Sequence, residues 1–312
     1  MAVRAGAAQQ AVDEIFVQND AVSVCMLVNR RARTVRVIDF RAGPSDAKRR
    51  FVLSIAKREG AAKAFTVVER DEVSTWLKLG FSKEGNIPSF YKRSDAFLLG
   101  CFVPRDLDPD EFEVPCESET RIVIPSRDPQ AERGLTAHDL MEKTVTLAKK
   151  LSKELPSTLP QAKVGAVTFA EARKALATAA RHGRSLGAFE PFGRDAECRY
   201  FSVAARGGFE LCASIETQAC FGNAVLEVSQ SPKNHGEMVG TAAALNALCS
   251  RLLTDETVSC FSLAPSDDVL LGAAFVHNGF RRTGLLLNHM LVGGRRLDAI
   301  VWSRKLGVVS AE

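Results

Sequence analysis

The stretch between residues 224 and 302 constrains the fold of this chain more than any other. A β-branched run at Ala224–Gln230 precedes a polar segment, Lys233–Gly240, which opens an apolar, alanine-rich helix. Two apolar runs with a helix between them follow, and a last run ends near Trp302. The stretch therefore predicts strand, turn, helix, strand, helix, strand, strand, with a turn before the first helix that is typical of anion binding.

The rest of the chain predicts two β-rich blocks around a polar middle. The first block has the order β-β-α-β-α-β-β between residues 21 and 103, and the second adds strands and a helix ahead of residue 224. Residues 104–135 are rich in Asp, Glu, Pro and Arg, with one predicted strand at Arg121–Ile124. Thr136 and Asp139 predict a capping box before a helix that ends near Glu154. We predict an incomplete N-terminal domain (1–104), a linker and connecting helix (105–160) and a C-terminal domain (161–312).

The two blocks also share a short pattern. Trp76–Gly85 and Phe275–Gly284 each read aromatic, three residues, Gly-Phe, three residues, Gly. In both, Gly-Phe falls where a helix ends and a strand begins, which is a common place for glycine. Chance is one explanation, but the matching order of the flanking elements favours an internal repeat.

Composition excludes several classes of function. The formal net charge is +4, and its Lys and Arg are spread along the chain, which does not favour nucleic-acid binding. The basic cluster Lys48–Arg50 lies on an amphipathic pattern and is expected on a solvated helix face. The eight cysteines show no metal-ligand spacing, no apolar run is long enough to span a membrane, and no signal peptide is evident. These features predict a cytoplasmic protein without a bound metal.

Further signatures narrow the family. Ile87–Ala96 carries an Ile-Pro-x-Phe-Tyr element, and Gly284–His289 leads to Gly293-Gly294 and Trp302. With the order of elements, these resemble the GNAT superfamily of N-acetyltransferases, and within it the beta-lysine N-acetyltransferase family. The resemblance implies a tandem GNAT-like α/β fold, an incomplete block before a complete one, with a mixed twisted sheet flanked by helices. It also implies acetyl-CoA as co-substrate and a small amine, such as a lysine-like amino acid, as acceptor.

The resemblance also implies a site for acetyl-CoA. The turn would hold the pyrophosphate through backbone N–H groups at a helix N-terminus, and N–H groups of the preceding strand would polarise the thioester. Met238 stands where the family usually has glycine, and His235 where it has Arg or Gln; Met238 either blocks or merely tightens the loop. The expected cofactor-binding residues are Val228, Gln230, His235, Gly236, Glu237, Met238, Val239, Gly240 and Thr241.

Glu227 and Glu216 are the candidates for the general base that deprotonates the amine. Each interrupts a β-branched or apolar strand, and a carboxylate on a partly buried face tends to a raised pKa, which suits proton removal. A solvated outer face is the alternative for either residue. The resemblance, which places an acidic residue on the strand before the loop, favours Glu227.

Two functions remain open. The superfamily usually protonates the leaving thiolate with a Tyr, where this chain has Phe275, so catalysis would need water as the proton donor. Tyr91, Asp95 and Asn288 are candidate substrate-binding residues, although Tyr91 and Asp95 equally fit an ordinary turn beside the core. The alternative to an enzyme is a catalytically degenerate GNAT-like protein that binds a ligand or another protein. Neither the acceptor nor the oligomeric state follows from the sequence.

Overall fold

The structure, a computed structural model, describes residues 12–18, 22–39, 43, 45–104, 136–205, 208–218 and 221–307. The predicted strand at 121–124 lies outside them. The strands are β1 (Val12–Gln18), β2 (Ser23–Asn29), β3 (Thr34–Asp39), β4 (Lys63–Val68), β5 (Ser82–Ile87), β6 (Ala96–Phe102), β7 (Ala162–Val167), β8 (Glu197–Ala205), β9 (Phe209–Thr217), β10 (Asn223–Val228), β11 (Ser259–Pro265), β12 (Arg281–Val292) and β13 (Arg295–Lys305). The helices are α1 (Asp46–Arg58), α2 (Val73–Lys78), α3 (Ala137–Ser152), α4 (Phe169–Arg181), α5 (His235–Thr254) and α6 (Val269–His277).

The elements follow the predicted order, with two corrections. The sequence analysis missed β1, which pairs antiparallel with β2 over seven residues. Lys48 is not on a solvated face of α1, as predicted, but buried, and its Nζ lies 2.5 Å from Asp39 Oδ2. The predicted capping box is present at the start of α3, where Thr136 and Asp139 bond each other's backbone N–H groups.

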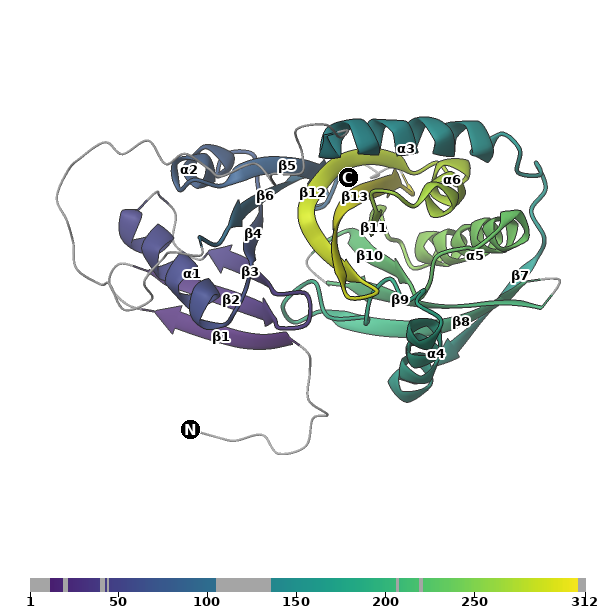
Figure 1. Cartoon of the computed structure of the whole chain (residues 1–312), viewed down its shortest axis with the longest axis horizontal. Helices are drawn as coiled ribbons and strands as arrows, with labels where there is room; N and C mark the ends of the chain where they lie inside the picture. Colours follow the sequence, from purple (N-terminus) through teal and green to yellow (C-terminus); the bar gives the residue numbers. More distant parts are fainter. Residues whose placement is uncertain are drawn as a thin grey trace.

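All thirteen strands of the described residues belong to one mixed sheet, in the order β1-β2-β3-β4-β6-β5-β12-β13-β11-β10-β9-β8-β7. In Figure 1 the N-terminal half is purple to blue and the C-terminal half teal to yellow, with the long β12 curving between them. The halves of the sheet are joined by a single residue pair, Gly85 of β5 with Gly284 of β12. None of the described helices is long and apolar enough to cross a membrane.

The two halves repeat one topology. In the N-terminal half, β3 and β4 are parallel neighbours joined through α1, and α2 leads to the antiparallel pair β5 and β6. In the C-terminal half, β10 and β11 are parallel neighbours joined through α5, and α6 leads to the antiparallel pair β12 and β13. The two glycines that pair at the junction, Gly85 and Gly284, are the last residues of the repeated sequence pattern.

The junction requires glycine at both positions. A Cβ on Gly85 would lie 2.7 Å from the Cα of Gly284, and a Cβ on Gly284 would lie 2.6 Å from the Cα of Gly85. These contacts are with backbone atoms, which cannot rotate away as a side chain can. The repeated glycine therefore has a packing reason, namely the close approach of two strands from different halves.

Most helices cover one face of each half, and α4 packs on the other face of the C-terminal half, against β8 and β9. Helices α1 and α2 pack on alternate residues of β2, β3 and β4, while α3, α5 and α6 cover one face of the C-terminal half. The opposite faces of the two halves meet in a third apolar cluster, where Phe90 and Leu98 of one half join Phe261 and Leu286 of the other. Near the junction, side chains that point away from α1 and α2 in one half and from α3, α5 and α6 in the other therefore face each other across the interior.

Candidate functional site

A cavity of about 100 Å³ lies between the two halves. Its walls come from β2, β3 and β4 on one side and from β10, β11 and β12 on the other, with residues 186–192 between them. Several polar side chains line it: Asn29, Arg31, Thr34, Arg36, Glu190, Glu227 and His289. A cavity with a few convergent polar groups and perturbed pKa values is the expected form of a small-molecule site.

Glu227, the favoured base, lies in this cavity. It sits on β10, and the Ser214 hydroxyl of the paired strand β9 donates to its carboxylate at 3.3 Å. Its pKa is raised to about 8, mainly by burial and then by the nearby carboxylates of Glu216 and Glu190, while the Arg31 guanidinium and the Ser214 hydrogen bond lower it in part. A carboxyl with a pKa near neutrality can exchange a proton with a substrate at ordinary pH.

Glu216, the second candidate, is buried and already engaged. Its two oxygens accept the backbone N–H groups of Phe192 and Gly193 at 2.7 and 2.6 Å. Burial raises its pKa, and these two hydrogen bonds counter the shift. Glu216 therefore holds the segment that lines one side of the cavity, whereas Glu227 keeps an oxygen without a hydrogen-bond partner among the described residues.

The N-terminal half contributes charged groups that the sequence analysis did not select. Arg31 makes a two-pronged contact with Glu190 at 2.7 and 2.9 Å, and the Asn29 amide donates to the same carboxylate at 2.7 Å. Arg36 donates to the Phe192 carbonyl at 2.5 Å. Arg36 interrupts the β-branched strand β3 much as Glu227 interrupts β10, so the signal used for Glu227 also marks Arg36.

His289 on β12 is the titratable residue of that strand that lines the cavity, and it is 8% exposed. Its ring meets that of Phe65 edge to face, with 4.8 Å between centroids. Burial lowers its pKa well below the usual value, and the charges of Lys63 and Arg296 add to the shift, so the ring is neutral. Its Nδ1 is buried and has no hydrogen-bond partner among the described residues.

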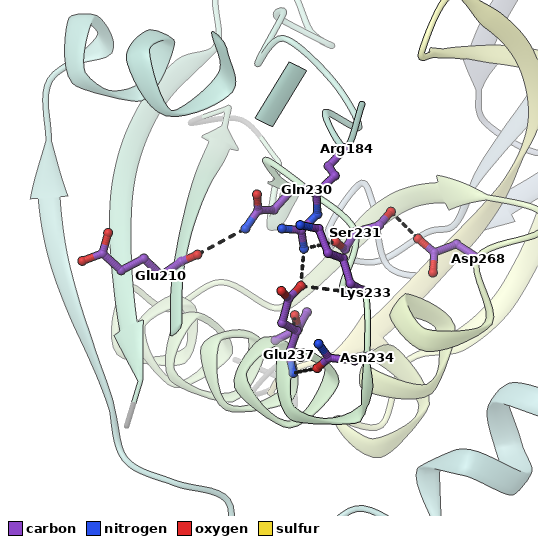
Figure 2. Close-up of polar contacts among 9 residues, drawn as sticks. Arg184, Glu210, Gln230, Ser231, Lys233, Asn234, Glu237 and Asp268 are labelled. Carbon is purple, nitrogen blue, oxygen red and sulfur yellow. Dashed lines mark hydrogen bonds and ion pairs between the residues drawn. The ribbon is translucent and has the colours of Figure 1, made fainter. Parts of the chain in front are cut away.

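The predicted turn lies at the N-terminus of α5 (Figure 2). Asn234 caps the helix by accepting the Glu237 N–H at 3.0 Å. The carboxylate of Glu237 folds back to accept the Lys233 N–H at 2.9 Å, and it forms an ion pair with Arg184. The N–H groups of His235 and Gly236 have no partner among the described residues. The turn therefore offers two free donors, but it also carries an acidic side chain of its own.

The later residues of this turn face the interior of the protein. Met238 is fully buried in the core, so its side chain does not block the outer face of the turn. A Cβ on Gly240 would lie 2.5 Å from the Phe209 ring, so this glycine serves packing. Thr241 is buried and its hydroxyl bonds the Glu237 carbonyl, while Val239 is half-buried beside the core.

Strands β10 and β11 pair over only three residues, ending at Val225 and Phe261. Val228, which lines the cavity, lies beyond the last of these pairs. The Gln230 side chain donates to the Glu210 carbonyl, and residues 184–186 pair with the chain on either side of Gln230 (Figure 2). The Ser231 hydroxyl bonds Asp268, the N-cap of α6, and so bridges the ends of the two diverging strands.

The three predicted substrate-binding residues do not line this cavity. The Tyr91 hydroxyl bonds the Val67 carbonyl at 3.3 Å, beside the apolar cluster between the halves. Asp95 accepts the Ser89 N–H at 2.9 Å and so stabilises the turn before β6. Asn288 is exposed, and its neighbour His289 occupies the cavity instead. Phe275 is buried and stacked on Trp302 at 5.9 Å.

Comparison with known proteins gives a fold-level likeness. No family model matches the sequence, and no curated protein is similar to it. Among the solved structures with similarity are two N-acetyltransferases. A spermidine N-acetyltransferase from Vibrio cholerae is 14% identical, over 47% of this chain and 94% of its own, with a TM-score of 0.37. The ribosomal-protein-S18-alanine N-acetyltransferase from Escherichia coli is 15% identical, over 48% and 97%, with a TM-score of 0.35. At this level the likeness does not decide the family.

Proposed function

We propose that this protein is an acetyl-CoA-dependent N-acetyltransferase that acts on a small amine, on a tandem GNAT-like fold. The observation that carries the proposal is Glu227, a carboxyl group with a pKa of about 8 in a cavity beside two diverging parallel strands. The repeated strand order supports the tandem arrangement. The free N–H groups of His235 and Gly236 support binding of a phosphate group at the start of α5.

Acetyl transfer requires the protein to position the two substrates and to accept one proton from the amine. Glu227 takes a proton from the acceptor ammonium, and the neutral nitrogen forms a bond to the acetyl carbon as the bond to sulfur breaks; the nitrogen then gives its second proton to water. The thiolate that leaves is protonated by water, because Phe275 has no proton to give. The cavity, of about 100 Å³, has room for a small acceptor.

A second candidate function is ligand binding without acetyl transfer. The acidic side chain of Glu237 at the anion turn favours it, because a carboxylate repels the phosphates that the turn would hold. The hydrogen bond between Ser231 and Asp268 also favours it, since that bond bridges the gap between the strands.

Titration calorimetry with acetyl-CoA, followed by an acetylation assay over a panel of small amines, separates the two functions. The informative variant is Glu237→Gln, which removes the charge at the turn but keeps the size of the side chain. We expect the variant to bind acetyl-CoA several-fold more tightly than the natural protein, a gain of about 1 kcal/mol. A matched control is Glu197→Gln, an exposed acidic residue on β8. Absence of binding by both the natural protein and Glu237→Gln would contradict the enzyme, and binding without turnover would favour the second function.

A further inference from the structure

Arg36 is a buried cation without an ion pair. It lies on β3, lines the cavity and is 7% exposed. Its guanidinium donates to the Phe192 carbonyl and stacks over the Phe192 ring, with 4.5 Å from Cζ to the ring centroid. Its Nε is buried and has no partner, and among the described residues no carboxylate lies within ion-pair distance of it. This arrangement is uncommon, because buried charges are normally paired.

Glu216, whose charge acts on Arg36, does not form a hydrogen bond with it. Glu216 acts on Arg36 through its charge, but its two oxygens are bound by the Phe192 and Gly193 N–H groups. An arginine carries five N–H donors in a fork that matches a carboxylate. Arg36 uses one nitrogen for a backbone carbonyl, so most of its donors remain for another acceptor in the cavity.

A second unpartnered group lies nearby in the same cavity. The ring of Phe192, under the Arg36 guanidinium, is 6.0 Å from Phe65, whose ring is in turn 4.8 Å from that of His289. His289 is more than nine-tenths buried, and its Nδ1 also lacks a partner. One aromatic wall therefore connects two buried polar groups that the protein itself leaves unsatisfied, which marks a place where a ligand completes the hydrogen bonding.

We propose that this wall binds the carboxylate of a small molecule, with Arg36 as the anion-recognising residue and His289 as a second hydrogen-bonding group. The inference rests on the proposed function, because the ligand is then the amine acceptor, with its ammonium at Glu227 and its carboxylate at Arg36. The N-terminal half supplies acceptor recognition, while the C-terminal half supplies the base. Arg31 and Gly187 line both this cavity and a neighbouring pocket.

Binding of matched small molecules, measured by calorimetry without any acetyl-CoA, tests the proposal. The probes are β-alanine, its neutral amide β-alaninamide, and propylamine, which has no carboxylate. We expect β-alanine to bind about 10- to 100-fold more tightly than the other two, as a charge-assisted hydrogen bond predicts. Arg36→Gln is expected to lose this preference and Arg36→Lys to keep part of it. Arg282→Gln, which breaks an ion pair with Glu142 on α3, is expected to bind as the natural protein does.

Arg36→Gln also removes a bond to the Phe192 segment, so a measurement on the unaltered protein is needed as well. In protein labelled with ¹⁵N-arginine, the buried Nε–Hε resonance of Arg36 is expected to shift with β-alanine and not with propylamine. Equal affinity for β-alanine and its amide, or an Nε–Hε signal unmoved by saturating β-alanine, would overturn the proposal. Acetylation of amines regardless of a carboxylate would also overturn it while leaving the proposed enzyme intact. Carboxylate binding without acetyl transfer would support the carboxylate site and contradict the proposed enzyme.

Discussion

The two halves of the molecule put different side chains at the same topological positions. Lys63, the first residue of β4, is equivalent to Ser259, the first residue of β11; they pair with Thr34 and Asn223, respectively. Glu84, before Gly85, is equivalent to Thr283, before Gly284. In the N-terminal half the result is a buried ion pair, with Lys63 Nζ 2.6 and 2.7 Å from the oxygens of Glu84. In the C-terminal half the equivalent Ser259 and Thr283 have separate partners: the Ser259 hydroxyl donates to the Ser89 carbonyl at 3.2 Å, and Thr283 Oγ1 lies 2.9 Å from Ser303 Oγ.

The same topology therefore carries buried charges in one half and apolar side chains in the other. Lys63 also donates to the Leu287 carbonyl of β12, so the ion pair fastens the N-terminal half to the other half. Next to it, Arg36 pairs with Phe65 where the C-terminal half has Val225 with Phe261. The N-terminal half therefore carries buried charge at the junction and at the cavity wall. The C-terminal half has an apolar pair there, and its acidic group in the cavity lies two residues on, at Glu227.

If the C-terminal half alone performs the chemistry, the largest effect will come from Glu227→Gln. Loss of a general base is expected to lower turnover by roughly 10²- to 10⁴-fold, with little change in acetyl-CoA affinity. Steady-state kinetics and calorimetry measure the two quantities, and Glu197→Gln, on an exposed face, serves as the control. Unchanged turnover in Glu227→Gln would remove this residue from the mechanism.

The Lys63–Glu84 ion pair links the two halves, so we expect its disruption to cause the largest loss of stability. Lys63→Met leaves the Glu84 carboxylate buried without its partner, and we expect the free energy of unfolding to fall by about 3–5 kcal/mol. The double variant Lys63→Met with Glu84→Leu removes both charges and is expected to be far milder. Chemical denaturation of the three proteins measures this. A double variant as unstable as the single one would show that the loss comes from packing rather than from an unpaired charge.

The close approach of the halves predicts a smaller loss. Gly284→Ala places a Cβ 2.7 Å from the Glu84 carbonyl oxygen and 2.6 Å from the Gly85 Cα, and overpacking of this kind costs about 1–3 kcal/mol. Gly165→Ala on β7 is the matched control, because its Cβ would meet nothing nearer than 4.0 Å. Thermal unfolding of both variants gives the comparison, and equal melting temperatures would argue against a tight junction.

The last expected effect is a pH dependence that belongs to the cavity. The folded protein holds the pKa of Glu227 at about 8, above the unfolded value of about 4.5, so it binds the proton more strongly. This contribution to stability is fully present below about pH 4.5 and is lost as the pH rises through 8. Glu227→Gln lacks the titration. Its melting temperature relative to the natural protein is therefore expected to rise between pH 5 and pH 9, and a constant difference would contradict the raised pKa.

Local patterns were enough to predict most elements and one member of the site. The β-branched run at Ala224–Gln230 and the cap at Asn234 have short-range causes, and the structure has β10 and the start of α5 there. Glu227 was selected because a carboxylate interrupts an apolar strand. Strand β1 was missed because its residues alternate between exposed and half-buried positions and show no continuous apolar run.

Neighbouring residues alone predict the order of helices and strands, the repeated Gly-Phe pattern and the candidate base. The three-dimensional packing was needed to show that Gly85 meets Gly284, that Arg36 and His289 share a cavity with Glu227, and that Glu216 is already bound. These contacts join residues distant in the chain. Their partners depend on how the two halves of the sheet pack against each other, and local propensity does not specify that packing.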